Sequence, residues 1–339
     1  MAKVVVLYNT DFDAEQAKQT PDLTSVRESA KAIAAALREA GHVVELTGVH
    51  GVEVYSVLDG VRRDAPDLLF NLCESMDGDS RNEPTFAGLL DLMGIRYTGA
   101  DLLALASCLY KYRTKEILDA HGVPTPPYRV LRSEADLAAA TGLDFPWFVK
   151  LAHEDASLGI TEANLVRSHA ELATRTRELW AEFKEPVLAE RFVDGREVNV
   201  TIFGYRETAE VLPLHEIDFG AMPGDRPKIV SYAAKWDEHH VDYAGTKPVP
   251  LRGLPPETIA NIQRVATAAY RAVDLRDYGR VDLRVDAGGI PWVIDVNPNP
   301  DISPDAGVCR AAAAAGMNYP QMVARIADLA LARYARVHP

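Results

Sequence analysis

Two apolar stretches near the C-terminus, each carrying an aspartate, restrict the fold more than any other feature. They read Gly279-Arg-Val-Asp-Leu283 and Val293-Ile-Asp-Val-Asn-Pro-Asn-Pro300, and the intervening Asp286-Ala-Gly-Gly289 is typical of a hairpin turn. Alternate side chains of a strand share a face, so Asp295 and Asn297 should point the same way and meet Asp282 of the partner strand. Burying two carboxylates together without a cation is costly, which favours a metal site over a pair of exposed acids. All-oxygen ligands of this kind suit magnesium.

Strands alternate with helices over about the first 100 residues, as is typical of a parallel α/β layer. We expect strands at residues 4–8, 43–46, 67–72 and 95–98, and helices at residues 25–40 and 83–93. Ser25 and Glu28 have the spacing of a capping box, so the first helix is expected to begin there.

After two short helices at residues 102–107 and 109–121, the pattern changes to a mixed α+β layer. Further strands are expected at residues 145–152, 186–192, 197–204, 209–217 and 228–235, and further helices at residues 168–183, 256–273 and 319–336. The polar, glycine- and proline-rich residues 222–251 are typical of a functional loop. We therefore expect an α/β (α+β) protein in three parts: residues 1–101 on the substrate side, 102–190 as a central part, and 191–339 with the metal site.

Length and charge exclude several classes of protein. The chain of 339 residues is too long for one ordinary core, and its net charge of −13 argues against nucleic-acid or anionic-membrane partners. No apolar run approaches the roughly 20 residues that cross a bilayer, and no signal peptide is recognisable. Three cysteines are too far apart to form a disulfide framework or a metal site. We expect a reduced, cytoplasmic enzyme.

Lysines form the second signal. Lys150 ends an apolar stretch, and residues 153–159, which include Ser157, have the character of a mobile loop over phosphates. Lys111 and Lys235 lie in partly apolar stretches. Each lysine alone is more often a solvated surface charge, so their weight comes from coinciding with the acidic cluster.

A third signal is the stretch Val187-Leu-Ala-Glu-Arg-Phe-Val193, followed by a tight turn and Glu197. Its backbone groups and its carboxylates, Glu190 and Glu197, are suited to binding an adenine and a ribose. An ordinary hairpin with exposed acids explains this stretch equally well.

Together these motifs resemble the ATP-grasp superfamily and, within it, the D-alanine–D-alanine ligase family. The resemblance runs from about residue 89 to the C-terminal helix, and its most specific parts are residues 94–99, 111–115, 148–150, 190–200 and 279–300. It implies an ATP-grasp fold behind an N-terminal parallel α/β (pre-ATP-grasp) domain. It also implies an ATP-dependent ligase that forms C–N bonds through an acyl phosphate, with a homodimer as the common assembly.

The resemblance further implies residue roles. The ATP phosphates would be held by Lys111, Lys150 and Lys235. Adenine would face Glu190 and the backbone of Arg191, Phe192 and Val193, and the ribose would face Glu197. Two Mg²⁺ ions, with Mn²⁺ as an alternative, would bind Asp282, Asp295 and Asn297, although Asp295 stands where the family usually has glutamate. The catalytic set would be Arg280, which stabilises the acyl phosphate and the tetrahedral intermediate, with Lys235 and the loop at Ser157.

The substrate side departs from the family. Residues 8–16 lack its glycine-rich turn, and residues 71–83 replace its His-Gly and Gly-Glu-Asp-Gly region. Ala156, Trp236, Asp301 and Ala306 stand where the family has serine, tyrosine, glycine and serine. Since a site that hydrogen-bonds its substrate rejects analogues strongly, these changes favour amino-acid or peptide substrates other than two D-alanines. The pocket candidates, each equally compatible with a structural role, are Asn71, Glu74, Arg81, His215, Asp301, Ser303 and Asp305.

Other functions remain open at this stage. A genuine D-alanine–D-alanine ligase with a divergent pocket is one alternative, and a kinase that stops at a phosphorylated product is another. A nucleotide-binding protein without turnover is a third, but it has no need for paired acids beside Arg280. We expect His239 and His240 to be loop residues without a metal.

Overall fold

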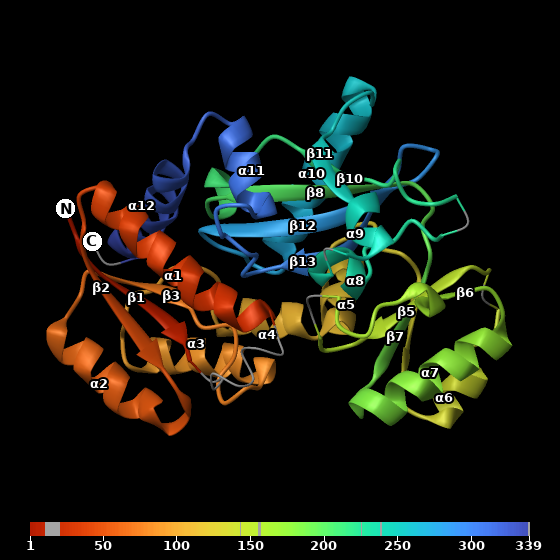
Figure 1. The fold of residues 1–339 in the computed structure, drawn as a ribbon, viewed down its shortest axis with the longest axis horizontal. Helices are drawn as coiled ribbons and strands as arrows, with labels where there is room; N and C mark the ends of the chain where they lie inside the picture. The colour runs from red at the N-terminus through yellow and green to blue at the C-terminus, as the bar shows by residue number, and fades with distance from the viewer. Residues whose placement is uncertain (11–20, 143, 155–156, 225, 238, 338–339) are drawn as a thin grey trace.

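The structure is a computed structural model that describes residues 1–10, 21–142, 144–154, 157–224, 226–237 and 239–337. Three sheets organise the chain (Figure 1). The N-terminal sheet is parallel, in the order β2 (Val43–Val49), β1 (Lys3–Asn9), β3 (Leu68–Leu72). The predicted α/β class and the parallel N-terminal layer are confirmed.

Strands β1 and β3 are buried on both faces, which explains why they are apolar without alternation, whereas the edge strand β2 is partly exposed. Val4 and Val6 belong to a core with α1 (Pro21–Glu39) and the C-terminal helix α12 (Tyr319–Val337). Val5 and Leu7 face the other way, into a core with α2 (Val54–Asp64) and α3 (Glu83–Leu92). The two ends of the chain therefore build one layer.

Three details of this layer differ from the sequence-based prediction. The first helix begins at Pro21, so Ser25 lies inside it and is not its N-cap. Residues 95–98 contribute one bridge, Leu69 to Tyr97, instead of a strand, because the chain turns at Gly99 with a φ of +86°. Helix α2 was not predicted, although its buried Val54, Leu58 and Val61 have helical spacing.

The central sheet is antiparallel, with the order β4 (Tyr128–Leu131), β7 (Val187–Arg191), β5 (Trp147–Leu151), β6 (Leu165–Val166). Helices α6 (Glu134–Ala139) and α7 (His169–Phe183) contribute buried side chains to the core of this sheet. Ser168 caps α7 by accepting a hydrogen bond from the Glu171 amide at 3.2 Å, as predicted. The core around Trp147, Val149 and Leu179 is separate from the other two cores.

The C-terminal sheet runs in the order β11 (Lys247–Pro250), β10 (His215–Asp218), β8 (Arg196–Phe203), β12 (Tyr278–Val285), β13 (Pro291–Asn297), with β9 (Glu210–Val211) paired to β8. Helix α10 (Pro256–Ala272) supplies buried side chains to the core beneath it. The remaining helices are α4 (Leu102–Leu109), α5 (Lys111–Ala120), α8 (Tyr232–Trp236), α9 (Val241–Gly245) and α11 (Gly307–Ala314).

Two strand predictions in this sheet were wrong in part. Residues 209–217 form two strands, because Pro213 has no amide hydrogen for the ladder. Residues 228–235 do not form a strand: Ser231 accepts a hydrogen bond from the Ala234 amide at 3.1 Å and starts helix α8.

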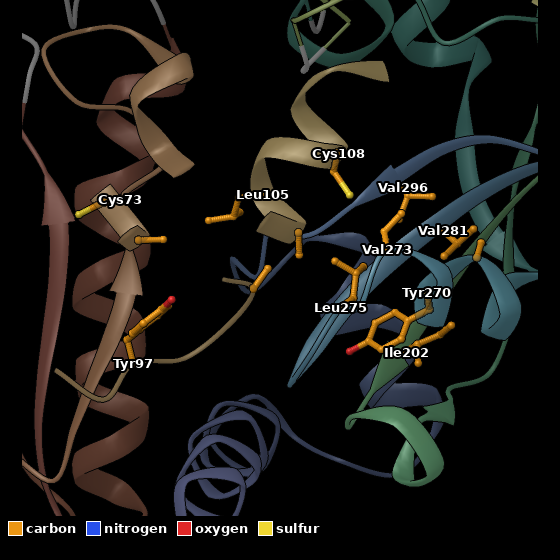
Figure 2. Close-up of a cluster of buried hydrophobic side chains, with 14 of the residues drawn as sticks. Cys73, Tyr97, Leu105, Cys108, Ile202, Tyr270, Val273, Leu275, Val281 and Val296 are labelled. Carbon is orange, nitrogen blue, oxygen red and sulfur yellow. The ribbon is translucent and has the colours of Figure 1, made fainter. Parts of the chain in front are cut away.

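One apolar core joins the N-terminal and C-terminal sheets. It extends from Cys73 and Tyr97 through Leu105 and Cys108 to Tyr270 and Val281 (Figure 2). The three predicted ranges, 1–101, 102–190 and 191–339, stay a prediction, and helix α12 packs against α1 across them. Within the described part of the chain, no helix combines the length and apolarity needed to span a membrane.

Candidate active site

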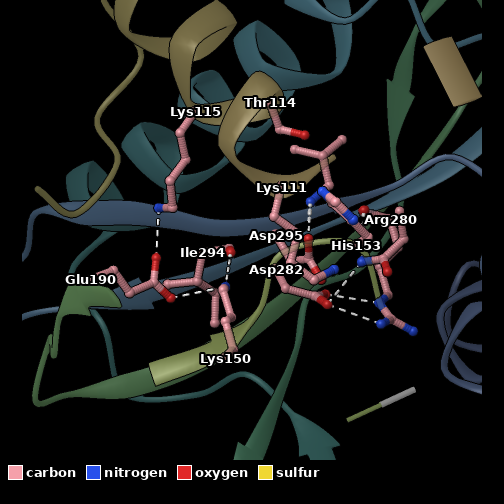
Figure 3. Close-up of polar contacts among 12 residues, drawn as sticks. Lys111, Thr114, Lys115, Lys150, His153, Glu190, Arg280, Asp282, Ile294 and Asp295 are labelled. Atoms are coloured by element: carbon pink, nitrogen blue, oxygen red, sulfur yellow. Dashed lines mark hydrogen bonds and ion pairs between the residues drawn. The ribbon is translucent and has the colours of Figure 1, made fainter. Parts of the chain in front are cut away.

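The predicted hairpin of β12 and β13 is present, and it contains a β-bulge. Its register pairs Arg280 with Asn297 and Asp282 with Asp295, and then shifts so that Leu283 faces Val293. Asp282, Asp295 and Asn297 consequently share the face that lines a large cleft, and Figure 3 shows the first two side by side. Their predicted proximity is confirmed, with the Asn297 amide donating to Asp282 at 3.0 Å.

Protein cations balance both carboxylates. The Arg280 guanidinium donates to the two oxygens of Asp282 at 2.8 and 2.9 Å, and Asn199 donates to the same carboxylate at 2.8 Å. Lys111 lies 3.3 Å from Asp295. Burial disfavours the charged form of Asp295, but Lys111 and Lys150 outweigh it and lower its pKa from 3.8 to about 2. Asp295 is therefore ionised at neutral pH.

Lys150 and Lys115 share one buried carboxylate. Lys150 lies 2.8 Å from one oxygen of Glu190, and Lys115 lies 2.6 Å from the other (Figure 3). Lys150 also donates to the Ile294 carbonyl at 2.9 Å, beside Asp295. Glu190 lines the cleft, but both its oxygens face lysines. Its expected contact with adenine stays a prediction.

The residues predicted to bind the nucleotide are held together by Arg284, which was not among the sequence-based predictions. Arg284 is 3% exposed and donates to Glu197 at 3.1 and 3.3 Å and to the Val193 carbonyl at 3.1 Å. Its guanidinium lies 4.8 Å from the ring centre of Phe192. Strand alternation provides the missed signal, since Arg284 shares a face with Arg280 and Asp282.

The cleft has a volume of about 1940 Å³ and brings most of the predicted residues together. Its walls come from all three sheets and from the loops between them. Every predicted nucleotide, metal and catalytic residue lines it: Lys111, Lys150, Ser157, Glu190, Arg191, Phe192, Val193, Glu197, Lys235, Arg280, Asp282, Asp295 and Asn297.

The substrate candidates divide into two groups. Glu74, Arg81, Asp301, Ser303 and Asp305 line the cleft. Asn71 and His215 are not among its described lining residues, so their assignment to the pocket is corrected. Asn71 is buried at the end of β3, where its side chain accepts from the Cys73 amide at 3.2 Å. His215 is buried on β10, with its Nδ1 3.1 Å from the Pro213 carbonyl.

Several lining residues could not be identified from the sequence. Glu185, Asn199 and Arg310 all border the cleft, and no local pattern marks them, because pairing and packing decide their positions. Ala156 and residues 11–16, which the sequence comparison singled out, lie outside the described residues. Trp236 lines the cleft at the end of α8.

The donor set fits a divalent metal. In the described chain no group of three or more histidine, cysteine, aspartate or glutamate side chains could hold an ion. The Asp282–Asp295–Asn297 set supplies carboxylate and amide oxygens instead, on adjacent strands of one hairpin. Hard cations prefer such oxygens, and Asp295 is charged at neutral pH because its pKa is lowered.

Comparison with known protein families identifies a long match. The family model described as D-ala D-ala ligase C-terminus matches residues 117–328. This range contains the lysine and carboxylate residues predicted for the nucleotide and the metal, except Lys111.

Individual proteins give the same picture. The D-alanine–D-alanine ligase of Chromohalobacter salexigens is 35% identical over 276 residues, which cover 80% of this chain and 80% of that protein. An uncharacterized protein of Sinorhizobium fredii, y4sG, is 31% identical over 312 residues, covering 90% and 88%. The crystal structure of the Bacillus anthracis D-alanine–D-alanine ligase complexed with ATP matches 99% of this chain and 100% of its own, with a TM-score of 0.76 and 21% identity. That last likeness concerns the fold.

Proposed function

This chain belongs to the D-alanine–D-alanine ligase-like family of ATP-grasp enzymes. From this starting point we propose that it joins the carboxylate of an amino acid or peptide to an amine, and that its substrates are not two D-alanines. It is an ATP-grasp ligase that forms C–N bonds. The single observation that supports the proposed mechanism is the convergence of lysines and paired carboxylates on one cleft, with Lys111 3.3 Å from Asp295.

The cationic side chains are suited to the triphosphate. Lys111, Lys150 and Lys235 line the cleft, and the first two contact the carboxylate hairpin, in a chain whose net charge is −13. A polyanion binds to such a protein only where positive charge is gathered locally. We assign the three lysines to the ATP phosphates, the backbone of residues 191–193 to adenine, and Glu197 to the ribose.

Asp282, Asp295 and Asn297 would hold the divalent metal, as two Mg²⁺ ions or with Mn²⁺ in their place. A bound divalent ion neutralises charge on the phosphoryl group during its transfer. The protein contributes a fixed hairpin for these ligands, and Arg280 and Lys111 orient the two carboxylates through the contacts they make with Asp282 and Asp295.

The reaction begins when an oxygen of the substrate carboxylate attacks the γ-phosphorus of ATP. The bond to the bridging oxygen breaks, ADP leaves, and an acyl phosphate forms. The amine then attacks the acyl carbon, phosphate leaves, and the amine loses a proton as the amide is completed. Arg280, which lines the cleft, would offset the developing oxyanion. Closure of the loop at Ser157 would keep water from the acyl phosphate.

The residues at the proposed substrate end of the cleft support substrates other than two D-alanines. Asp301 accepts hydrogen bonds from the backbone and hydroxyl of Ser303 at 2.8 and 3.0 Å, so a charged turn stands where the family has glycine. Ala306 offers no hydroxyl, whereas Arg310, one helical turn later, lines the cleft. A pocket with other polar groups selects other partners, because an unpaired buried polar group opposes binding.

The test is ADP release from ATP and Mg²⁺ with amino acids supplied singly and in pairs, followed by mass spectrometry of the products. We expect release that depends on both a carboxylate and an amine, with the mass of an amide. Rapid formation of a D-alanine dipeptide would overturn the substrate part of the proposal. A phosphorylated product that forms without any amine dependence would favour the kinase alternative.

A further inference from the structure

The bulge in β13 decides which way the metal-site side chains point. In a regular strand, Val293, Asp295 and Asn297 would share one face. Here Val293 and Val296 are both buried in the apolar core, at 1% and 2% exposure, while Asp295 and Asn297 line the cleft. The extra residue, Ile294, produces this reversal, because a one-residue slip moves every later side chain to the opposite face.

A bulge at the edge of a sheet leaves backbone groups without ladder partners. Within the described residues, β13 is the last strand of its sheet, and no described strand pairs with its outer edge. Three bonds from other segments satisfy that edge. The Val293 amide donates to the Pro124 carbonyl at 2.8 Å, the Val293 carbonyl accepts from the Thr125 hydroxyl at 2.8 Å, and the Ile294 carbonyl accepts from Lys150 at 2.9 Å. The bulge is therefore fixed from outside its own sheet.

Thr125 and Lys115 complete a closed chain of polar contacts around the bulge. Lys115 donates to the Thr125 hydroxyl at 2.7 Å. It also pairs with Glu190, whose other oxygen contacts Lys150 (Figure 3). Lys115 and Thr125 are 2% and 7% exposed. Neither is among the described residues that line the cleft, so neither is placed to touch ATP or a metal.

We propose that Thr125 and Lys115 are positioning residues of the metal site, which hold the Ile294 bulge and so turn Asp295 and Asn297 from the core to the cleft. The inference rests on the proposed function only in taking Asp282, Asp295 and Asn297 as metal ligands. Nothing in it depends on the identity of the amino-acid substrates.

The test uses full-length protein with Thr125→Val, which removes the hydroxyl and keeps the shape, and Thr125→Ser, which keeps the hydroxyl. Tyr270→Phe is the matched control, because it deletes one buried hydrogen bond to a backbone carbonyl, that of Gly204 at 2.8 Å, away from the cleft. The probe is Mn²⁺, titrated in the presence of a non-hydrolysable ATP analogue, with free Mn²⁺ measured by electron paramagnetic resonance. Hydrogen exchange of the peptide spanning residues 291–297 is measured in parallel.

We expect Thr125→Val to weaken Mn²⁺ binding by about fivefold or more and to accelerate exchange in residues 291–297, as loss of a buried hydrogen bond should. Thr125→Ser should stay within about twofold of the wild type, and Tyr270→Phe should leave Mn²⁺ binding unchanged even where it lowers Tm. Unchanged Mn²⁺ affinity in Thr125→Val would overturn the proposal, and so would equal weakening in Tyr270→Phe. A wild type that fails to bind Mn²⁺ would overturn the metal site and this inference together. Mn²⁺ binding without any amine-dependent ADP release would contradict only the proposed substrates.

Discussion

Replacing Asp295 with asparagine tests the centre of the site with almost no change in shape. The carboxylate lies 3.3 Å from Lys111 and directly opposite Asp282. Its pKa is lowered from 3.8 to about 2, because Lys111 and Lys150 outweigh the effect of burial. At about 1.4 kcal/mol per pKa unit, Asp295→Asn should lose roughly 2 kcal/mol of folding stability at pH 7, or about 3 °C in Tm.

The sign of this stabilisation follows from the lowered pKa. The stabilisation by Asp295 is fully present above pH 3.8 and is lost as the pH falls through about 2, so the neutral range shows the whole effect. The loss of activity should be much larger than the loss of stability. Removing a metal ligand costs several kcal/mol in the transition state, so we expect kcat for ADP release to fall by about 1000-fold or more.

The assay is coupled ADP release at saturating ATP and Mg²⁺, with thermal unfolding followed on the same samples. Asp295→Glu is the matched variant, because it keeps the charge and carries the side chain usual in the family. It should retain activity and reach half-maximal rate at no higher Mg²⁺ than the wild type. A kcat for Asp295→Asn within tenfold of the wild type would remove Asp295 from the metal site and refute the reasoning.

Three further perturbations probe other parts of the cleft. Burial raises the pKa of Glu185 from 4.5 to about 7, so the folded protein keeps this proton to higher pH than the unfolded chain does, and folding stability falls as the pH rises across that range. Glu185→Gln should therefore recover up to about 3 kcal/mol of stability at pH 8 and almost nothing at pH 4. Urea unfolding at both pH values measures this difference. Arg284→Met removes the buried partner of Glu197, since the Arg284 side chain is only 4% exposed, and should destabilise the fold by about 3 kcal/mol and raise KM for ATP. A double variant with Glu197→Gln should recover stability. An unchanged unfolding midpoint in the single variant would contradict the buried pair. Arg280→Lys cannot reproduce the bidentate contact with Asp282 at 2.8 and 2.9 Å and should lower kcat by about 100-fold. Steady-state ADP release measures this effect. A change confined to KM would argue that Arg280 serves substrate binding alone.

The local elements were predictable wherever short-range chemistry dominates. Ser168 with Glu171 marked the start of α7, and the glycine-rich turn after Val285 marked the hairpin. Prediction failed where a single residue changes the structure of a stretch whose overall pattern favours a strand. Residues 228–235 are apolar enough for a strand, yet Ser231 caps a helix there, and Pro213 divides a stretch that otherwise alternates like a single strand.

The substrate pocket was the least predictable part of the site. Asn71 and His215 are polar residues in suitable stretches, but burial turns both inward to backbone partners. Arg310 and Glu185 line the cleft without any sequence pattern to mark them. Which polar side chain faces a cleft depends on how separate sheets pack, and that information is spread over the whole chain.

By itself, the sequence determined the types of residue at the site, because acids set into apolar strands and lysines at strand ends are local features. It also determined that Asp295 and Asn297 share a face, since strand geometry alone requires it. Tertiary structure decided that this face is the cleft and not the core, through a bulge whose backbone is held by Pro124, Thr125 and Lys150. A bulge needs partners for its unpaired backbone groups, and those partners lie more than 100 residues earlier in the chain, where no local pattern predicts them.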